Sequence, residues 1–212
     1  MRNYRSEIAA FVSRYLRRRG WPERLRWDPC LRSDGVSASC LTLSDRLPGP
    51  AFRRGTGLKF SVTSDHHRLN TSRFGRPAEV INRHGRKGHG RTLSCLERGG
   101  DPISAIAFHR PHEQSAPLLI TGIAVIESDS DPAQATLSRV MAGILLVYLA
   151  AGADKAGHPT RLGLGGGRPD DLASDLGFRK TAAPSVYRQS GAGYREWVPP
   201  RGLSRARRAP NR

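Results

Sequence analysis

The sequence predicts an α+β fold in which flanking helices cover a mixed central sheet. Residues 118–126 are an apolar run rich in β-branched residues, and apolar residues at helical spacing follow over residues 136–153. Gly157 and Pro159 end that helix, and residues 161–164 form a second, short strand. A strand, a helix and a strand in this order predict a parallel strand pair, with the helix packed on one face of the sheet.

An antiparallel meander is predicted before this parallel unit. Residues 91–96 and 103–108 are apolar segments on either side of Glu97-Arg-Gly-Gly-Asp-Pro102, a sequence typical of a hairpin turn. Residues 36–43 and 58–63 are two further strand candidates. The meander leads directly into the parallel unit, so it adds antiparallel strands to the same sheet.

The last part of the domain is predicted as a short helix followed by closing strands at Val186-Tyr187-Arg188 and Tyr194-Arg-Glu-Trp197. The short helix contains the motif Leu172-Ala-Ser-Asp-Leu176-Gly177-Phe178. This motif and the order of elements over residues 91–198 together resemble the GNAT superfamily of acetyl-CoA-dependent N-acetyltransferases. The resemblance implies a single GNAT-like domain over residues 1–200, with acetyl-CoA as its cofactor.

The resemblance also implies which residues would hold the cofactor. In the family, a long strand polarises the thioester carbonyl through its backbone, and a glycine-containing turn after it binds the pyrophosphate. The turn of this chain has no glycine, but free N–H groups at a helix N-terminus bind phosphate without one. The candidate residues are Ile123 and Val125 on the strand, and Gln134, Ala135, Thr136, Leu137, Ser138 and Arg139 at the turn and the start of the helix.

Two residues are candidates for acid–base catalysis. Glu127 ends the central strand, where several family members carry a carboxylate that deprotonates the amine. Many members have a tyrosine as general acid where this chain has Ala173, and Tyr187 is the nearest substitute. A solvated loop carboxylate and a core tyrosine remain the structural alternatives. The glycines that follow the second parallel strand would admit the pantetheine arm in the family frame, or form a flexible turn: Gly163, Gly165, Gly166 and Gly167.

Charge is distributed unevenly along the chain. The formal net charge is +17, and residues 1–100 carry 21 basic against eight acidic side chains. Residues 101–200 carry nine against ten. Codon usage in a high-GC genome explains a preference for arginine over lysine, but it does not explain an excess confined to one half. The excess predicts that residues 1–100 contact a polyanion, RNA or DNA.

The remaining segments have their own expectations. Residues 4–19 have one apolar face and predict an amphipathic helix, whereas the polar stretch 65–90 predicts a long functional loop and residues 201–212 a disordered basic tail. Three widely spaced cysteines favour a reduced, cytoplasmic setting. The histidines lack zinc-ligand spacing, and apolar runs long enough to cross a membrane are absent, so neither a metal site nor a membrane span is expected.

These observations favour an acyl-CoA-dependent N-acyltransferase that acts on a primary amine, with the amine on an anionic or nucleic-acid-linked carrier. Two alternatives stay open. One is a non-catalytic GNAT-like domain that binds nucleic acid through its basic N-terminal part, residues 1–90. The other is a small interaction partner within a larger assembly. The sequence does not determine the oligomeric state.

Overall fold

The computed structural model describes residues 40–43, 58–64, 66–87, 91–96, 100–128, 132–165, 170–190 and 193–199. The helix expected over residues 4–19, the start of the strand expected over 36–43 and the tail expected over 201–212 lie outside these residues. All statements below concern the described part of the chain.

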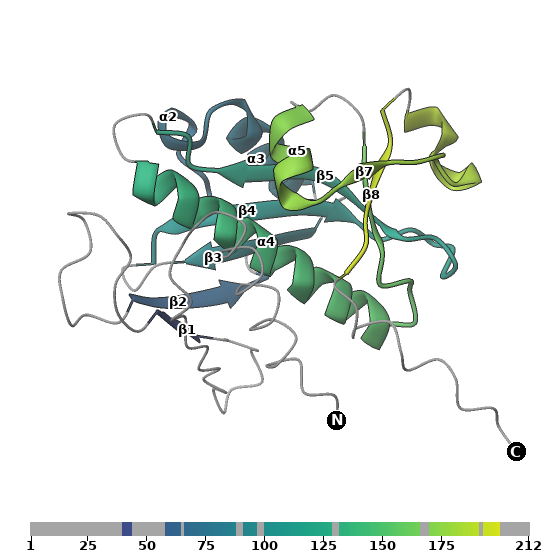
Figure 1. Ribbon diagram of the computed structural model, residues 1–212, viewed down its shortest axis with the longest axis horizontal. Coiled ribbons are helices and arrows are strands. Elements are labelled where there is room, and N and C mark those ends of the chain that lie inside the picture. The colour runs from purple at the N-terminus through teal and green to yellow at the C-terminus, as the bar shows by residue number, and fades with distance from the viewer. Residues whose placement is uncertain are drawn as a thin grey trace, which may run out of the picture.

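The described part is built around an eight-stranded mixed sheet (Figure 1). The strands lie in the order β1-β2-β3-β4-β5-β6-β8-β7, and every neighbouring pair is antiparallel except β5 and β6. The predicted meander and the predicted parallel pair are both present. The strands are β1 Cys40–Leu43, β2 Leu58–Thr63, β3 Arg91–Leu96, β4 Pro102–His109, β5 Leu118–Val125, β6 Leu162–Leu164, β7 Arg179–Lys180 and β8 Arg195–Trp197.

Helices cover both faces of the sheet. The long helix α4, Pro132–Lys155, crosses one face, and α2, Thr71–Phe74, with α3, Arg76–Lys87, lies behind the sheet in Figure 1. The short helix α5, Asp170–Leu176, packs beside α4. The core lies on both sides of β4 and β5, whose central residues are almost completely buried.

Helix α4 is the central helix of the core. Four consecutive residues, Ile144 to Val147, are all buried, so the helix is enclosed on every side at this point. Among the described residues, it is also the helix long and apolar enough to cross a membrane, with a mean hydropathy of 1.5 over Leu137–Asp154. Because 76% of that window is buried inside the protein, α4 is typical of the core helix of a globular domain.

The predicted loop over residues 65–90 is wrong, because most of this stretch forms α2 and α3. Asn70 caps α2 by accepting a hydrogen bond from the Ser72 backbone N–H at 2.9 Å, and Gly75, at φ +61°, ends the helix. Helix α3 buries only a few small or apolar side chains, chiefly Ala78 and Ile81, against the sheet. Its three arginines and one histidine otherwise obscure the apolar period in the sequence.

Two other predictions need correction. Residues 186–188 do not form a closing strand but belong to the 3₁₀ helix η1, Ser185–Ser190, which begins after Pro184. The Tyr187 N–H donates to the Pro184 carbonyl at 2.8 Å and closes the first turn. Helix α4 also starts earlier than expected, at Pro132, because proline fits the first helical position, where its missing N–H costs nothing.

Candidate cofactor and acceptor site

Strands β5 and β6 are paired for only three residues. Leu118, Leu119 and Ile120 face Leu162, Gly163 and Leu164, and the Gly165 N–H adds a last hydrogen bond to the Ile120 carbonyl at 3.2 Å. Strand β5 continues for five more residues, of which the last four, Gly122 to Val125, pair with β4 on the other edge. The edge of β5 that faces β6 at its start therefore loses this neighbour halfway along the strand.

A β-bulge lies at the point where the two parallel strands part. Ala107 of β4 pairs with Gly122 and Phe108 pairs with Ile120, so Thr121 is the extra residue of β5. The Thr121 hydroxyl oxygen is buried and has no hydrogen-bond partner. Bulges redirect side chains and occur often beside active sites. The residue at which β5 loses β6 as a neighbour therefore carries a buried, unsatisfied hydroxyl.

Helix α3 is packed tightly over this bulge. A Cβ atom at Gly122 would lie 3.1 Å from Cγ1 of Ile81 and 3.6 Å from Cγ1 of Val80. A side chain larger than hydrogen at position 122 would push α3 away from the sheet. The segment that we predicted as a loop therefore contains a helix, α3, which packs against the sheet at the point where β5 and β6 diverge.

A polar pair that sequence reasoning missed lies on the neighbouring strand. The Tyr194 hydroxyl donates to Oε1 of Glu196 at 3.1 Å, and Nη1 of Arg161 lies 3.7 Å from Oε2 of Glu196. Burial and the negative charge of Glu196 raise the pKa of the Tyr194 phenol far above its usual range. Tyr194 therefore keeps its proton at neutral pH. The alternation of β8, which puts residues 194 and 196 on one face, was the available signal.

The Tyr194 ring packs directly against the backbone of Gly163. A Cβ atom at position 163 would lie 2.7 Å from the Tyr194 hydroxyl oxygen and 2.9 Å from Cε2 of its ring. We interpreted the glycines after residue 162 as a way in for the pantetheine arm. For Gly163 this interpretation is wrong, because the space above its backbone is filled by the tyrosine ring.

The two predicted acid–base residues lie at opposite ends of β5. The Tyr187 hydroxyl donates to the Pro117 carbonyl, next to the first residue of the strand, at 2.6 Å. Burial, with a smaller effect of the Glu113 charge, raises the pKa of Tyr187 to about 12. Glu127 lies two residues beyond the end of the strand and is exposed. An eight-residue strand spans about 25 Å, so the structure does not bring these residues to one substrate.

The predicted pyrophosphate residues divide into two groups. Because α4 begins at Pro132, the amides of residues 136–139 lie beyond the first turn, where helical N–H groups bond to carbonyls four residues earlier. Gln134 and Ala135 belong to the first turn of α4. Of the six predicted residues at the turn and the helix start, these two lie in the turn where a helix N-terminus binds anions.

The other members of the predicted helix set hold α4 in place. The Ser138 hydroxyl accepts from the Ile126 N–H at 2.8 Å and donates to the Ile103 carbonyl at 2.6 Å. Leu137 is buried in the core. Nη1 of Arg139 lies 3.5 Å from Oδ2 of Asp175 on α5, and Arg139 is the eighth residue of the helix rather than a first-turn residue.

Ile123 and Val125 lie in the part of β5 that extends beyond β6. Both side chains are buried in the core, and contact of their backbones with a cofactor stays a prediction. Among the described residues, no group of three histidine, cysteine, aspartate or glutamate side chains could hold a metal ion.

No family model matches the sequence, and no curated protein matches it. Solved structures do match. An IAA acetyltransferase from Bacillus cereus is 18% identical over 58% of this chain and 79% of that one, with a TM-score of 0.40. A GNAT family acetyltransferase from Elizabethkingia anophelis with acetyl-CoA bound is 17% identical over 59% and 78%, with a TM-score of 0.40. AtaTR bound with acetyl-CoA is 10% identical over 66% and 92%, with a TM-score of 0.42. Two of these matched structures are named as acetyltransferases, one of them of the GNAT family. The mixed sheet with its flanking helices is the α+β fold that the sequence predicts.

Proposed function

We propose that the protein is an acyl-CoA-dependent N-acyltransferase, which transfers an acetyl group to a primary amine on an anionic carrier. The observation that carries this proposal is the parting of β5 and β6 at the Thr121 bulge. A pantetheine arm carries amide groups, and an extended chain of amides can lie against the open edge of a strand. The buried Thr121 hydroxyl, which has no partner, offers a further hydrogen bond beside this edge.

The first turn of α4 would receive the pyrophosphate. Helix N-termini bind phosphate because their outward N–H groups and the helix dipole both favour negative charge. Gln134 and Ala135 lie in this turn, shortly after the end of β5. The backbones of Ile123 and Val125 lie between this turn and the bulge, so phosphate and thioester would contact opposite ends of the same five-residue stretch.

Tyr194 and Glu196 supply the acid–base chemistry in this proposal. When bound, acetyl-CoA supplies a thioester carbonyl for attack by the amine and a thiolate as leaving group. Tyr194 packs on Gly163, which pairs with Leu119, two residues before the bulge. Tyr194 is protonated at neutral pH, and it would give this proton to the thiolate only as its oxygen receives another from Glu196, because a free phenolate with so high a pKa would take the proton back. Glu196 accepts the proton that the amine loses and returns a proton to the Tyr194 oxygen, with which it is hydrogen-bonded.

Isothermal titration with acetyl-CoA tests the proposal, and Ala135 offers a matched pair of variants. Ala135→Glu places a negative charge against the pyrophosphate, while a carboxylate in the first turn favours the helix dipole by about 0.3–1 kcal/mol. We therefore expect at least tenfold weaker binding with an unchanged or higher melting temperature. Ala135→Gln, which has the same shape without the charge, should bind nearly as the wild type does.

Each outcome of this titration decides something about the proposal. Absence of both a binding heat and a thermal shift in the wild-type protein would refute the proposed function. Equal binding by the Glu and Gln variants would show that the pyrophosphate lies elsewhere and would remove α4 from the site.

A further inference from the structure

The α2–α3 side of the molecule is strongly basic. Residues 66–87 contain six arginine and lysine residues and a single acid, Glu79. Arg68, Arg76 and Arg83 are exposed, and Arg73 is half-buried. This unit, here called the α2–α3 face (residues 66–87), belongs to the basic N-terminal half and has a formal net charge of +5, six basic residues against one acid.

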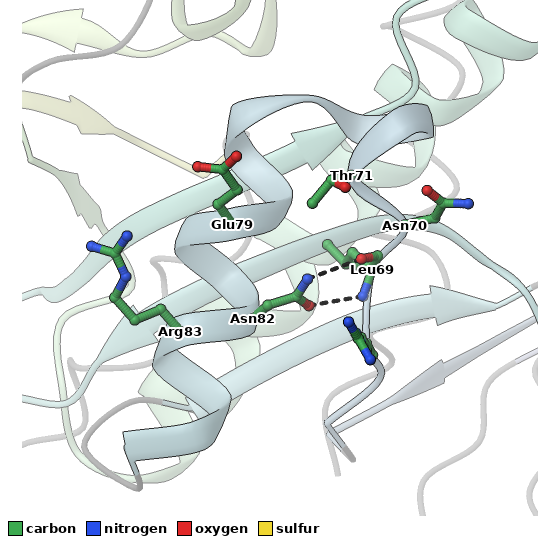
Figure 2. Close-up of a pocket in the computed structure, with 7 residues that line it drawn as sticks. Leu69, Asn70, Thr71, Glu79, Asn82 and Arg83 are labelled. Carbon is green, nitrogen blue, oxygen red and sulfur yellow. Dashed lines mark hydrogen bonds between the residues drawn. The ribbon is translucent and has the colours of Figure 1, made fainter.

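The α2–α3 face contains a cavity of about 610 Å³ between α3 and the segment that enters α2 (Figure 2). Glu79 and Arg83 project from α3 on the side away from the segment that carries Asn70 and Thr71, and all four residues line the cavity. Arg68 also lines it. The lining is therefore polar, with two guanidinium groups against one carboxylate.

A buried amide makes the two sides of this cavity rigid. Oδ1 of Asn82 accepts from the Leu69 N–H at 2.8 Å, and its Nδ2 donates to the Leu69 carbonyl at 2.9 Å (Figure 2). The two hydrogen bonds reproduce the pairing that one strand residue gives another. They fix the backbone beside Arg68 against the helix that carries Arg83. Groups that are already positioned lose less entropy when they bind a ligand.

The charged groups of the cavity have no partners inside the described part of the protein. Glu79 and Arg83 have the spacing of a helical ion pair, yet neither forms one, and Arg68 has no ion pair or hydrogen bond with another described residue. The guanidinium donors of Arg68 and Arg83 are therefore available to an anionic ligand.

We propose that the α2–α3 face docks a nucleic acid by its phosphate backbone, with Arg68 and Arg83 as contacts to phosphates along it. Guanidinium groups bind phosphate oxygens in a two-pronged geometry, and the side chains of Asn70 and Thr71 can hydrogen-bond to sugar or phosphate. Arg73 and Arg76 extend the positive surface beyond the cavity, as a repeating polyanion requires.

The composition of the surface favours nucleic acid over a membrane. Among the described residues, the exposed large hydrophobic side chains are Val186 and Val198, and neither belongs to the α2–α3 face. Interfacial membrane binding needs an apolar face beside the basic one. This inference names the anionic carrier of the proposed function and in that respect rests on it, but docking itself requires neither acetyl-CoA nor acyl transfer.

Fluorescence anisotropy with a labelled single-stranded RNA and a labelled DNA duplex, without acetyl-CoA, tests the inference. Affinity should fall steeply between about 50 and 200 mM salt, because phosphate contacts release counterions. Replacing both Arg68 and Arg83 by alanine should weaken binding at least tenfold and reduce the salt slope by about 1 to 2, the value expected for one or two lost phosphate contacts. Glu79→Gln, which removes the one repulsive carboxylate of the cavity, should tighten binding.

The control removes the same charge elsewhere. Arg179 and Lys180 are exposed on β7, the edge strand of the sheet, and replacing both by alanine lowers the net charge by the same two units. Binding by this variant should stay within about twofold of the wild type. Equal losses in both double variants would show that net charge alone attracts the oligonucleotide and would overturn the inference.

Two other results would also overturn it: no binding to either oligonucleotide at low salt, or tighter binding to polyglutamate or to vesicles of anionic phospholipid than to RNA and DNA. Melting temperatures identify any variant that fails to fold, and Glu79→Gln keeps the test decisive if the double arginine variant does. Failure here leaves the acetyl-CoA titration unaffected, so the two proposals fall separately.

Discussion

Replacing Gly163 by alanine should destabilise the fold, although alanine is normally tolerated better than glycine in a regular element. The new Cβ atom would lie 2.7 Å from the Tyr194 hydroxyl oxygen and 2.9 Å from Cε2. The ring cannot simply turn aside, because it stacks on Tyr187 at 6.1 Å and its hydroxyl is bonded to Glu196. Either β6 or the tyrosine must therefore move.

The size of the effect follows from two opposing contributions. Overpacking of this kind costs about 1–3 kcal/mol, and loss of the hydrogen bond to Glu196 adds about 1 kcal/mol. Alanine restricts the unfolded chain more than glycine does, which returns about 0.4–1 kcal/mol. We expect a net loss of about 1–3 kcal/mol in the free energy of unfolding, measured by urea denaturation.

Two comparison variants show whether Tyr194 causes this loss. A Cβ atom at Gly152, in α4, would have no atom within 4 Å, so Gly152→Ala should stabilise the protein by about 0.5–1 kcal/mol. Tyr194→Leu removes the crowding ring atoms, and in that background Gly163→Ala should cost nothing. A cost that is equal in both backgrounds would refute the reasoning, as would a Gly163→Ala variant as stable as Gly152→Ala.

Two further predictions concern Tyr187 and Arg139. Tyr187→Phe leaves the Pro117 carbonyl without its hydrogen bond and should cost about 1–3 kcal/mol at neutral pH. The folded pKa of Tyr187, about 12, exceeds the ordinary value of 10.0, so the extra stability of the wild type is complete below pH 10 and declines as pH rises to 12. Urea unfolding across that range should show the stabilities of the two proteins converging. A constant difference would contradict the assignment. Arg139→Glu should lower the free energy of unfolding by about 1 kcal/mol, because it faces Asp175 with a like charge. Adding Asp175→Arg should restore stability in the same assay. No recovery would show that the pair of residues 139 and 175 does not cause the loss.

Strand positions were predictable wherever the signal is local. The bounds of β2 and β3, residues 58–63 and 91–96, are those expected from β-rich segments bounded by turn residues. The parallel pair followed from the order of strand, long helix and strand, because a crossover of that length returns to the same sheet. These inferences depend only on residues close together in the chain.

Helix α3 could not be predicted because what stabilises it is distant in sequence. Its buried surface comes from a few residues such as Ala78 and Ile81, which stabilise the helix by packing on the sheet beside the bulge, at Gly122. Asn82 is polar and reads as a loop residue, yet it is buried, since the backbone of Leu69, thirteen residues earlier, satisfies its amide. No local pattern reveals that partner.

Tyr194 and Glu196 of the candidate site could not be predicted from the sequence for the same reason. Tyr194 and Glu196 approach the parallel strands only because β8 lies beside β6, which sets Glu196 opposite Gly163. That pairing joins residues on either side of α5 and η1. Tyr187 looked equivalent from composition alone, but Pro184 starts a 3₁₀ turn that directs its hydroxyl to the Pro117 carbonyl.

The double hydrogen bond of Ser138 has a mechanical consequence for the end of α4. One hydroxyl group joins the second turn of the helix to Ile126, directly after β5, and to Ile103 near the start of β4. The helix end therefore cannot rock or slide without breaking a bond in a dry environment, where an unsatisfied group costs several times more than in water. A ligand arriving at this end meets a stationary surface rather than a closing lid. Any adaptation to ligands of different length must then come from the ligand, or from the loops around it.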